Sequence, residues 1–454
     1  MRLYIDTLTR AAAAAVLLGS LVRPLAAQTA DTTVLTLGGA ARLAARQSAP
    51  AESARLRADE AEARARQARS ALLPQLAADV GESQRTVNSA TFGLSFPPPP
   101  GQEPFLDPSG QIIGPINLLD ARARLSTNVF NPAAFARFNA ARTAASAANV
   151  EATAQSEGAA TIAASAYLRV LRAEGVLQAR EADSTLAAEL VTIAQQQLRA
   201  GTGVGLDVTR AQAQLAGTRA QLITARNELD RSQLDLRRVL NLPLDARVVF
   251  ADSLSAAVAA PAPADEAAIV QDAVRRRPDV RAAQRQVDAA RQAVGAARAE
   301  RLPSIGAFAD DGYIGKKANN LLNTYDWGVQ VSVPLFTGGR IAARVAEQQA
   351  VASEAEVRLR DLRQQAEVEA RGALLDLRAA AEAVEAVRER LRLAEQEVAQ
   401  ARARFRAGVA GNADVATASL GLNVARTALV DALTALQSAR VALARARGTV
   451  TELP

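Results

Sequence analysis

Few residues in this chain could carry out chemistry, because the sequence contains no His and no Cys. Their absence removes the common zinc and iron ligands, the Cys nucleophiles and the His bases. Two candidates remain. The segment Gly201-Thr202-Gly203-Val204-Gly205 is as glycine-rich as a phosphate-binding loop. The adjacent carboxylates Asp310 and Asp311 could act as a general acid and a general base.

Neither candidate lies on the structural element that its chemistry needs. The glycine-rich segment falls between two predicted helices rather than between a strand and a helix, so it cannot cradle a phosphate in the usual geometry. Asp310 and Asp311 stand beside a predicted loop, where an exposed or ion-coordinating turn is the better interpretation. We therefore expect no catalytic residue, no cofactor and no metal site, and we expect that the protein is not an enzyme.

The net charge of +6 raises the question of a nucleic-acid partner. Such a partner needs cations that are gathered on one face of the protein. Here Arg alternates with Glu and Asp along the predicted helices, as in Arg388-Glu389-Arg390. This alternation is typical of solvated helix faces, so we predict no binding to nucleic acid.

The first 27 residues have the features of a secretory signal peptide. Arg2 and Arg10 flank its start, Ala11 to Val22 is apolar, and Leu25-Ala26-Ala27 offers small residues for cleavage. An apolar run of about 12 residues is too short to span a bilayer as a helix but suits a signal peptide. Because no Cys follows this leader, we expect an exported protein that is not lipid-anchored.

The rest of the chain contains an internal duplication. Residues 42–76 and 271–305 are both rich in Arg, Ala and Glu, and both contain a Leu-Pro pair near their end. Leu198-Arg199-Ala200-Gly201 recurs as Phe405-Arg406-Ala407-Gly408, and an Asp-Val pair follows each at the same separation. Internal similarity of this kind predicts two copies of one structural unit.

We place the first copy at residues 28–260 and the second at 261–454, with a short linker of residues 256–264 at the junction. Each copy is predicted to hold a helix, a β-hairpin and a pair of long helices. The predicted hairpins and helix pairs are hairpin 74–130 with helices in 132–242, and hairpin 303–336 with helices in 340–447.

Proline placement predicts the length of the helices. No Pro occurs in residues 133–242 or 335–453, and proline-free, Ala-rich segments can form helices far longer than the usual length of about 10–14 residues. Asn131 suits the N-cap position and Pro132 the first helical position. A helix from there to Leu198 would be about 100 Å long.

An apolar seam with a spacing of seven residues runs along these helices, with Ala repeating three positions later in the second copy. Large residues that alternate with Ala indicate a coiled coil with knobs-into-holes packing. Arg180 interrupts the seam of the first long helix and is the one misfit. The seam residues are Ala370, Leu377, Val384, Leu391, Val398 and Phe405; Val415, Leu422, Leu429, Leu436 and Leu443; and Val208, Leu215, Leu222, Leu229 and Leu236.

Each copy also contains segments with a period of two, which is the pattern of a strand with one apolar face. Residues 119–129 and 325–335 show it clearly, and the preceding runs 76–94 and 304–313 complete two hairpins. Such strands fit a transmembrane barrel with a wet interior, whereas a hairpin packed on helices in a soluble protein is the alternative. A barrel needs about eight strands or more, so several chains would share one. From the residues alone, a dimer with eight strands and a larger assembly are equally open.

Several motifs together suggest a family. They are the Arg/Ala helices that end in Leu-Leu-Pro (72–74) or Arg-Leu-Pro (301–303), the strand end Val-Pro-Leu-Phe-Thr-Gly-Gly-Arg (333–340), and the Arg-Ala-Gly turns followed by Asp-Val. In this duplicated order the sequence resembles the TolC-type outer-membrane efflux proteins over essentially the whole mature chain. The resemblance implies a mainly α fold in which long antiparallel coiled-coil helices form an α-barrel. It also implies a homotrimer in which four strands per chain build a shared 12-stranded transmembrane β-barrel.

The resemblance further implies a location in the outer membrane, in contact with its lipid, with the helical tunnel in the periplasm. The protein would be the passive exit duct of a tripartite efflux or type I secretion system. Its partners would be a periplasmic adaptor (membrane fusion) protein and an inner-membrane pump of the RND or ABC type. The alternative is a periplasmic coiled-coil scaffold without channel activity.

Position in the family also assigns roles to the two glycine-rich turns. The residues that would form the adaptor-contacting tips are Gly201, Gly203, Val204, Gly408, Val409 and Gly411. Asp207 and Asp414 would form the pore gate, where a ring of carboxylates favours cations; their alternative role is to cap the helix that follows. Thr417 stands at a second acidic position of the family and Ala410 at a basic one, which weakens the expectation of a tightly latched resting gate.

Overall fold

The computed structural model describes residues 33–92, 110–254, 266–409 and 411–454. The predicted signal peptide, the predicted linker at 256–264 and Ala410 lie outside the described residues. Among the described helices, none is both long enough and apolar enough to cross a membrane.

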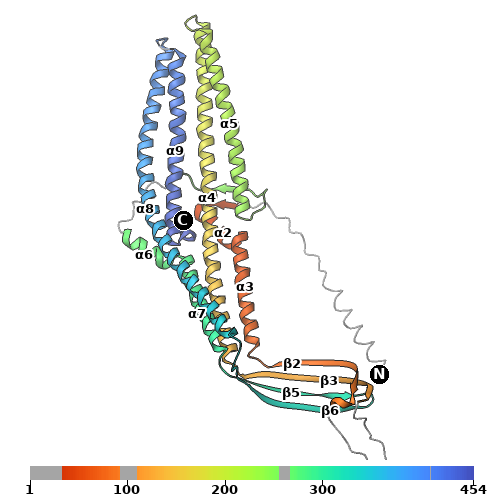
Figure 1. The fold of residues 1–454 in the computed structure, drawn as a ribbon. Coiled ribbons are helices and arrows are strands. Elements are labelled where there is room, and N and C mark those ends of the chain that lie inside the picture. Colours follow the sequence, from red (N-terminus) through yellow and green to blue (C-terminus); the bar gives the residue numbers. More distant parts are fainter. Residues whose placement is uncertain (1–32, 93–109, 255–265, 410) are drawn as a thin grey trace, which may run out of the picture.

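The two halves of the chain form their main elements in the same order (Figure 1). In the first half these are α2 (Leu37–Gln47), α3 (Ala49–Ser70), β2 (Gln75–Asn88), β3 (Ile112–Phe130), α4 (Pro132–Arg199) and α5 (Gly205–Val239). In the second half they are α6 (Glu266–Arg276), α7 (Pro278–Ala299), β5 (Ser304–Gly315), β6 (Leu321–Ser332), α8 (Arg340–Arg406) and α9 (Asn412–Arg447). The short strands β1 (Thr33–Leu35) and β4 (Val248–Phe250) pair in parallel, and the 3₁₀ turns η1 (Ser89–Phe92) and η2 (Val450–Glu452) complete the list.

The start and length of the first long helix agree with the sequence signals. Asn131 is the N-cap of α4, and its side-chain oxygen accepts a hydrogen bond of 2.9 Å from the backbone N–H of Ala134. Helix α4 has 68 residues and α8 has 67. Each is therefore about 100 Å long, as the sequence predicted.

The long helices pack side by side, and the sheet lies at the end opposite to the tips (Figure 1). In the tip half, α4 lies between α5 and α9, and α8 packs on α9; in the sheet half, α7 lies between α4 and α8, and α3 packs on α4. In the second copy the seam is buried as predicted at positions such as Val384, Val398 and Leu436.

In α5 the buried seam differs from the predicted one. Of the predicted residues, Leu236 is buried, whereas Val208, Leu215, Leu222 and Leu229 are only half-buried. The other buried positions are the smaller Ala211, Thr218, Ala225 and Ser232, three residues after each of these four. Helix α5 packs mainly on α4. Small side chains let two helix backbones approach closely, so the contact with α4 uses this stripe.

The predicted misfit Arg180 belongs to a buried ionic cluster between α4 and α9. Arg180 Nη1 lies 3.0 Å from Asp183 Oδ2, and Arg426 Nη1 lies 2.8 Å from Asp183 Oδ1. The Asp183 side chain is fully buried, and Arg180 also donates to the Thr427 hydroxyl. The cluster separates two apolar cores, one around Tyr167 and Val384 and the other, nearer the tips, around Leu190 and Phe405.

The four longer strands form one antiparallel sheet in the order β2-β3-β5-β6. Its apolar face includes Leu76, Val80, Trp327 and Val329, and all four are at least 65% exposed. No other strand pairs with the outer edge of β2 or of β6 within the part of the chain that the structure describes. A single chain therefore leaves both an apolar face and two sheet edges uncovered.

The Asp183 cluster predicts a large difference between two neighbouring substitutions. Asp183→Ala leaves Arg180 and Arg426 without their buried partner, so we expect it to lower the free energy of unfolding by about 3–5 kcal/mol. Glu181→Ala removes a half-exposed carboxylate that lies 3.7 Å from Arg226, so we expect a loss below about 1 kcal/mol. Urea unfolding followed by circular dichroism measures both, and equal losses would contradict the role of the cluster.

Candidate functional site: the polar face of the sheet and the helical tips

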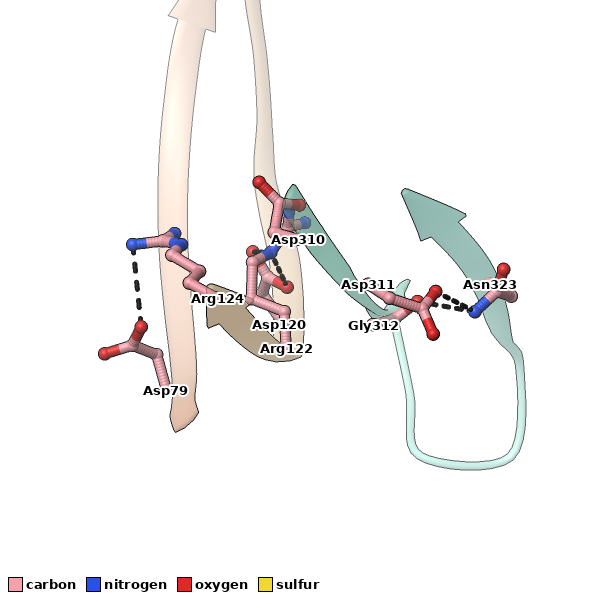
Figure 2. Close-up of polar contacts among 8 residues, drawn as sticks. All are labelled: Asp79, Asp120, Arg122, Arg124, Asp310, Asp311, Gly312 and Asn323. Atoms are coloured by element: carbon pink, nitrogen blue, oxygen red, sulfur yellow. Dashed lines mark hydrogen bonds and ion pairs between the residues drawn. The ribbon is translucent and has the colours of Figure 1, made fainter. Parts of the chain in front are cut away.

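Charged residues gather on the face of the sheet opposite to Trp327. Arg122 on β3 binds two carboxylates, with Nε 2.9 Å from Asp120 Oδ1 and Nη1 2.8 Å from Asp310 Oδ1 on β5 (Figure 2). These three side chains are at most 31% exposed. Such paired charges can line a wet surface and still hold two strands in register.

The strand register extends this charged face to β2. Arg122 is the cross-strand partner of Asp79, and Arg124 is the partner of Asp310. Because side chains two residues apart share a face of a sheet, Arg124 also lies on this side. Its Nη1 atom is 3.5 Å from Asp79 Oδ2 (Figure 2). Five charged residues from three strands thus form one polar face.

The interpretation of Asp310 and Asp311 as an exposed or ion-coordinating turn is wrong. Both lie inside β5, where adjacent residues point to opposite faces. Asp310 faces Arg122, whereas Asp311 accepts a hydrogen bond of 2.8 Å from the Asn323 amide (Figure 2). Each carboxylate has its own partner, so the two cannot work together as an acid and a base.

The two glycine-rich turns have the same backbone structure. After α4, the N–H of Gly201 donates to the C=O of Leu198 and the N–H of Thr202 to that of Gln197. After α8, Gly408 and Val409 donate in the same pattern to Phe405 and Arg404. Both glycines have a left-handed backbone, with φ of 75° and 71°. This is the Schellman motif of a helix C-terminus, which satisfies carbonyl groups and prefers Gly. The first turn joins two helices and is no phosphate loop.

The structure brings the two tips together. The Asn412 amide donates to the C=O of Asp207 at 3.0 Å, and the Gln197 amide donates to the C=O of Phe405. Around them Val204 and Val409 remain exposed, and Gly411 is the N-cap of α9. Neither Gln197 nor Asn412 is predicted from the sequence, because no local pattern marks a polar side chain that reaches another hairpin.

Asp207 and Asp414 lie in the first turns of α5 and α9, but neither caps its helix. The N-caps are Val204 and Gly411, and no side chain caps either helix. Asp207 is half-buried and Asp414 is exposed. Among the described residues, neither carboxylate has a hydrogen-bond or ion-pair partner. The capping alternative is therefore wrong, and both charges face the positive ends of their own helices.

The described part of the chain holds no cluster of three or more acidic side chains that could bind a metal ion. The charged residues with a candidate function lie on the polar face of the sheet at one end and beside the tips at the other. The two places are joined by the long helices α4 and α8 (Figure 1).

Comparison with known proteins gives a consistent match. The sequence profile of the family "Outer membrane efflux protein" matches residues 42–242 and 269–449. The alkaline protease secretion protein AprF of Pseudomonas aeruginosa is 30% identical over 182 residues, which are 39% of this chain and 38% of AprF. The solvent efflux pump outer membrane protein SrpC of Pseudomonas putida is 30% identical over 178 residues, 38% of this chain and 37% of SrpC. The chain thus aligns with well under half of the length of these curated relatives.

Solved structures match over a much larger part of the chain. The crystal structure of the outer membrane protein VceC from Vibrio cholerae superposes with a TM-score of 0.73 at 21% sequence identity. The match covers 91% of this chain and 96% of VceC. At this identity the similarity establishes the fold.

The Schellman turns predict opposite effects for three Gly→Ala substitutions. Gly201→Ala and Gly408→Ala each force a left-handed backbone on a residue with a Cβ, so we expect each to cost about 1–2 kcal/mol. Gly217→Ala is the matched control inside α5, where an added Cβ meets nothing within 4 Å. We expect it to stabilise the helix by up to about 1 kcal/mol. Urea unfolding distinguishes them, and a cost for Gly217→Ala equal to the others would contradict this explanation.

Proposed function

Because the chain belongs to the outer membrane efflux protein family, we propose that it is a subunit of an outer-membrane channel. The channel serves as the passive exit duct of a tripartite efflux or type I secretion system. The observation that carries this proposal is the four-stranded sheet, which has an uncovered apolar face, a charged face and two open edges. It is joined directly to helices about 100 Å long.

The open edges support a homotrimer. In lipid, the unpaired N–H and C=O groups of β2 and β6 would each cost several kcal/mol, so only a closed barrel can hold this sheet. Four strands are too few to close, and twelve strands from three chains fall within the range of known barrels. The family match favours three copies over the dimer that the residues alone left open.

The two faces of the sheet support an assignment of inside and outside. The face with Leu76, Val80, Trp327 and Val329 suits outer-membrane lipid, and the face with Arg122, Arg124 and Asp310 suits a water-filled lumen. The long helices then form a tunnel in the periplasm. The alternative, a periplasmic scaffold without channel activity, does not explain the exposed apolar face of the sheet.

The tips support a role in gating and assembly. Val204, Val409 and the neighbouring Gly201, Gly203, Gly408 and Gly411 would contact a periplasmic adaptor, which links the duct to an inner-membrane pump of the RND or ABC type. The unpaired carboxylates of Asp207 and Asp414 would form rings at the inner rim of the tunnel. Rings of carboxylates attract cations, so divalent cations would bind there and obstruct flow.

The gate proposal predicts an effect of divalent cations on conductance. The purified oligomer in a planar bilayer is expected to conduct, and millimolar Mg²⁺ is expected to reduce the current. In Asp207→Asn/Asp414→Asn the reduction should be several-fold weaker, because a neutral amide attracts a divalent cation less strongly than a charged carboxylate does. Asp230→Asn, at an exposed Asp of α5, is the control and should behave as the wild type. Unchanged Mg²⁺ sensitivity of the conductance in the double variant would contradict the proposed gate. An absence of conductance in the wild type would contradict the proposed channel.

The inside–outside assignment predicts opposite outcomes at two adjacent residues of β6. Val329→Arg places a charge on the apolar face, so we expect a cost of about 2–4 kcal/mol and loss of the heat-modifiable oligomer from outer-membrane extracts. Gln330→Arg places the same charge on the polar face, next to water, and should leave the yield of oligomer near that of the wild type. Equal yields for both variants would contradict the assignment.

A further inference from the structure

A cavity of about 580 Å³ lies beside the last turns of α9, far from both the sheet and the tips. Helices α2, α4 and α8, the segment after β4 and the segment that ends at Pro454 contribute the rest of its wall. Most of this wall is apolar and comes from Leu37, Leu168, Leu171, Leu377, Leu443 and Leu453.

One face of α9 brings three polar side chains to this apolar cavity. Arg440 follows Gln437 by three residues, and Arg447 follows Arg440 by seven. This spacing places all three on the same side of the helix. Gln437 is only 7% exposed, and within the described chain its amide makes no hydrogen bond. Arg440 has no ion pair there either, and the buried Nε atom of Arg447 has no partner. Burial lowers the pKa of Arg440, because desolvation disfavours its charge.

The acidic residues of the cavity wall make no ion pair with these arginines in the described structure. Asp252 is engaged elsewhere, since its Oδ2 atom accepts from the N–H of Leu37 at 2.7 Å and from the Tyr167 hydroxyl at 3.1 Å. Burial and the nearby Asp252 charge raise the pKa of Tyr167, so its hydroxyl stays a donor. Glu452 is exposed and makes no ion pair with Arg440 or Arg447 in the described structure. The cavity therefore joins a leucine wall to two arginines that make no ion pair among the described residues.

We propose that this cavity binds a single-chain amphiphile with an anionic head group. The acyl chain lies along the leucine wall, and the carboxylate or phosphate head accepts hydrogen bonds from Arg440, Arg447 and the Gln437 amide. The three donors lack a partner, and an anion would accept their hydrogen bonds. The rest of the wall is apolar and would contact an apolar chain.

The position of the cavity favours this ligand over two other occupants. A second copy of the chain would extend the helical layer at α5 and α3 on one side and at α8 on the other, whereas the cavity centres on α9 and α4. A lipid of the bilayer would lie too far away, because Leu168 is 36 residues along α4 from the sheet end at Pro132, or about 50 Å. The amphiphile therefore comes from solution.

The test uses a dodecanoate probe with a photoreactive diazirine at the end of its chain. The full-length oligomer, held in phosphatidylcholine nanodiscs, is irradiated with the probe, and labelled peptides are mapped by mass spectrometry. We expect labelling of the peptides around Leu168, Leu171 or Leu377, one probe per chain. Unlabelled dodecanoate and dodecyl phosphate should compete, because both have the anionic head and the chain. Dodecanol and acetate, which each lack one of the two, should not.

Substitutions on α9 test the role of the three donors. Arg440→Gln/Arg447→Gln should lower the labelling of these peptides by about tenfold or more, because charge-assisted hydrogen bonds to the head group are lost. Arg445→Gln, an exposed position in the same last turn, is the matched control and should leave labelling unchanged. Gln437→Leu preserves both arginines and should lower labelling by a smaller factor.

The outcomes that overturn the proposal are distinct from those that overturn the channel. Labelling that dodecanol competes for equally, labelling only elsewhere, or an equal loss in Arg445→Gln would each remove the anion site. Should the double variant fail to assemble, Gln437→Leu alone decides: unchanged labelling removes the site. Each result leaves the wild-type conductance in planar bilayers as a separate measurement, so the site and the channel can fail independently.

Discussion

A sheet that has an apolar face but no partner at its edges can be stable in a membrane only when further strands pair with those edges. The strands β2 and β6 present such edges, and Leu76 and Trp327 stand on the uncovered face. The hydrocarbon of a bilayer offers no hydrogen bonds, so the backbone groups of both edges need another copy of the sheet. In the proposed channel this requirement is met by a closed barrel of several chains. Because α4 begins directly after β3, the helices of these chains are then arranged with the same symmetry as the barrel.

The helices meet a different constraint, because they are long and their buried seams combine larger residues with many Ala. Close packing along such seams gives many contacts that are individually weak. The buried Asp183 of α4 adds a stricter requirement, because its contact with Arg426 forms only where that residue of α9 is level with it. A polar residue at one seam position is known to specify register in coiled coils. The cluster also divides the helical layer into an apolar core near α2 and another near the tips.

Local signals predicted much of this structure, and non-local contacts account for what they missed. The start of α4 followed from Asn131 and Pro132, and the turns at Gly201 and Gly408 from their glycines, because caps and turns depend on a few adjacent residues. Asp310 was interpreted as part of a turn because strand ends depend on pairing with β3, which lies far away in the sequence. Arg180 looked like a misfit because Arg426 and Thr427 belong to the other half of the chain. The leucine-walled cavity was invisible for the same reason.

The two duplicated halves have similar sequences, but they make different contacts. Both tips form the same Schellman turn, and each is followed by an Asp in the first turn of the next helix. Yet Asn412 of the second tip donates to the backbone of Asp207 in the first, and no equivalent bond is described in the other direction. Helix α9 lies between α4 and α8, whereas α5 packs mainly on α4. In the proposed trimer the six tips therefore form two sets of three, and a movement of the first hairpin must break a contact with the second. Separation of the two hairpins of one chain at the proposed tunnel end would break the hydrogen bonds of Asn412 and Gln197, together with the nearby ion pair between Arg402 and Glu189.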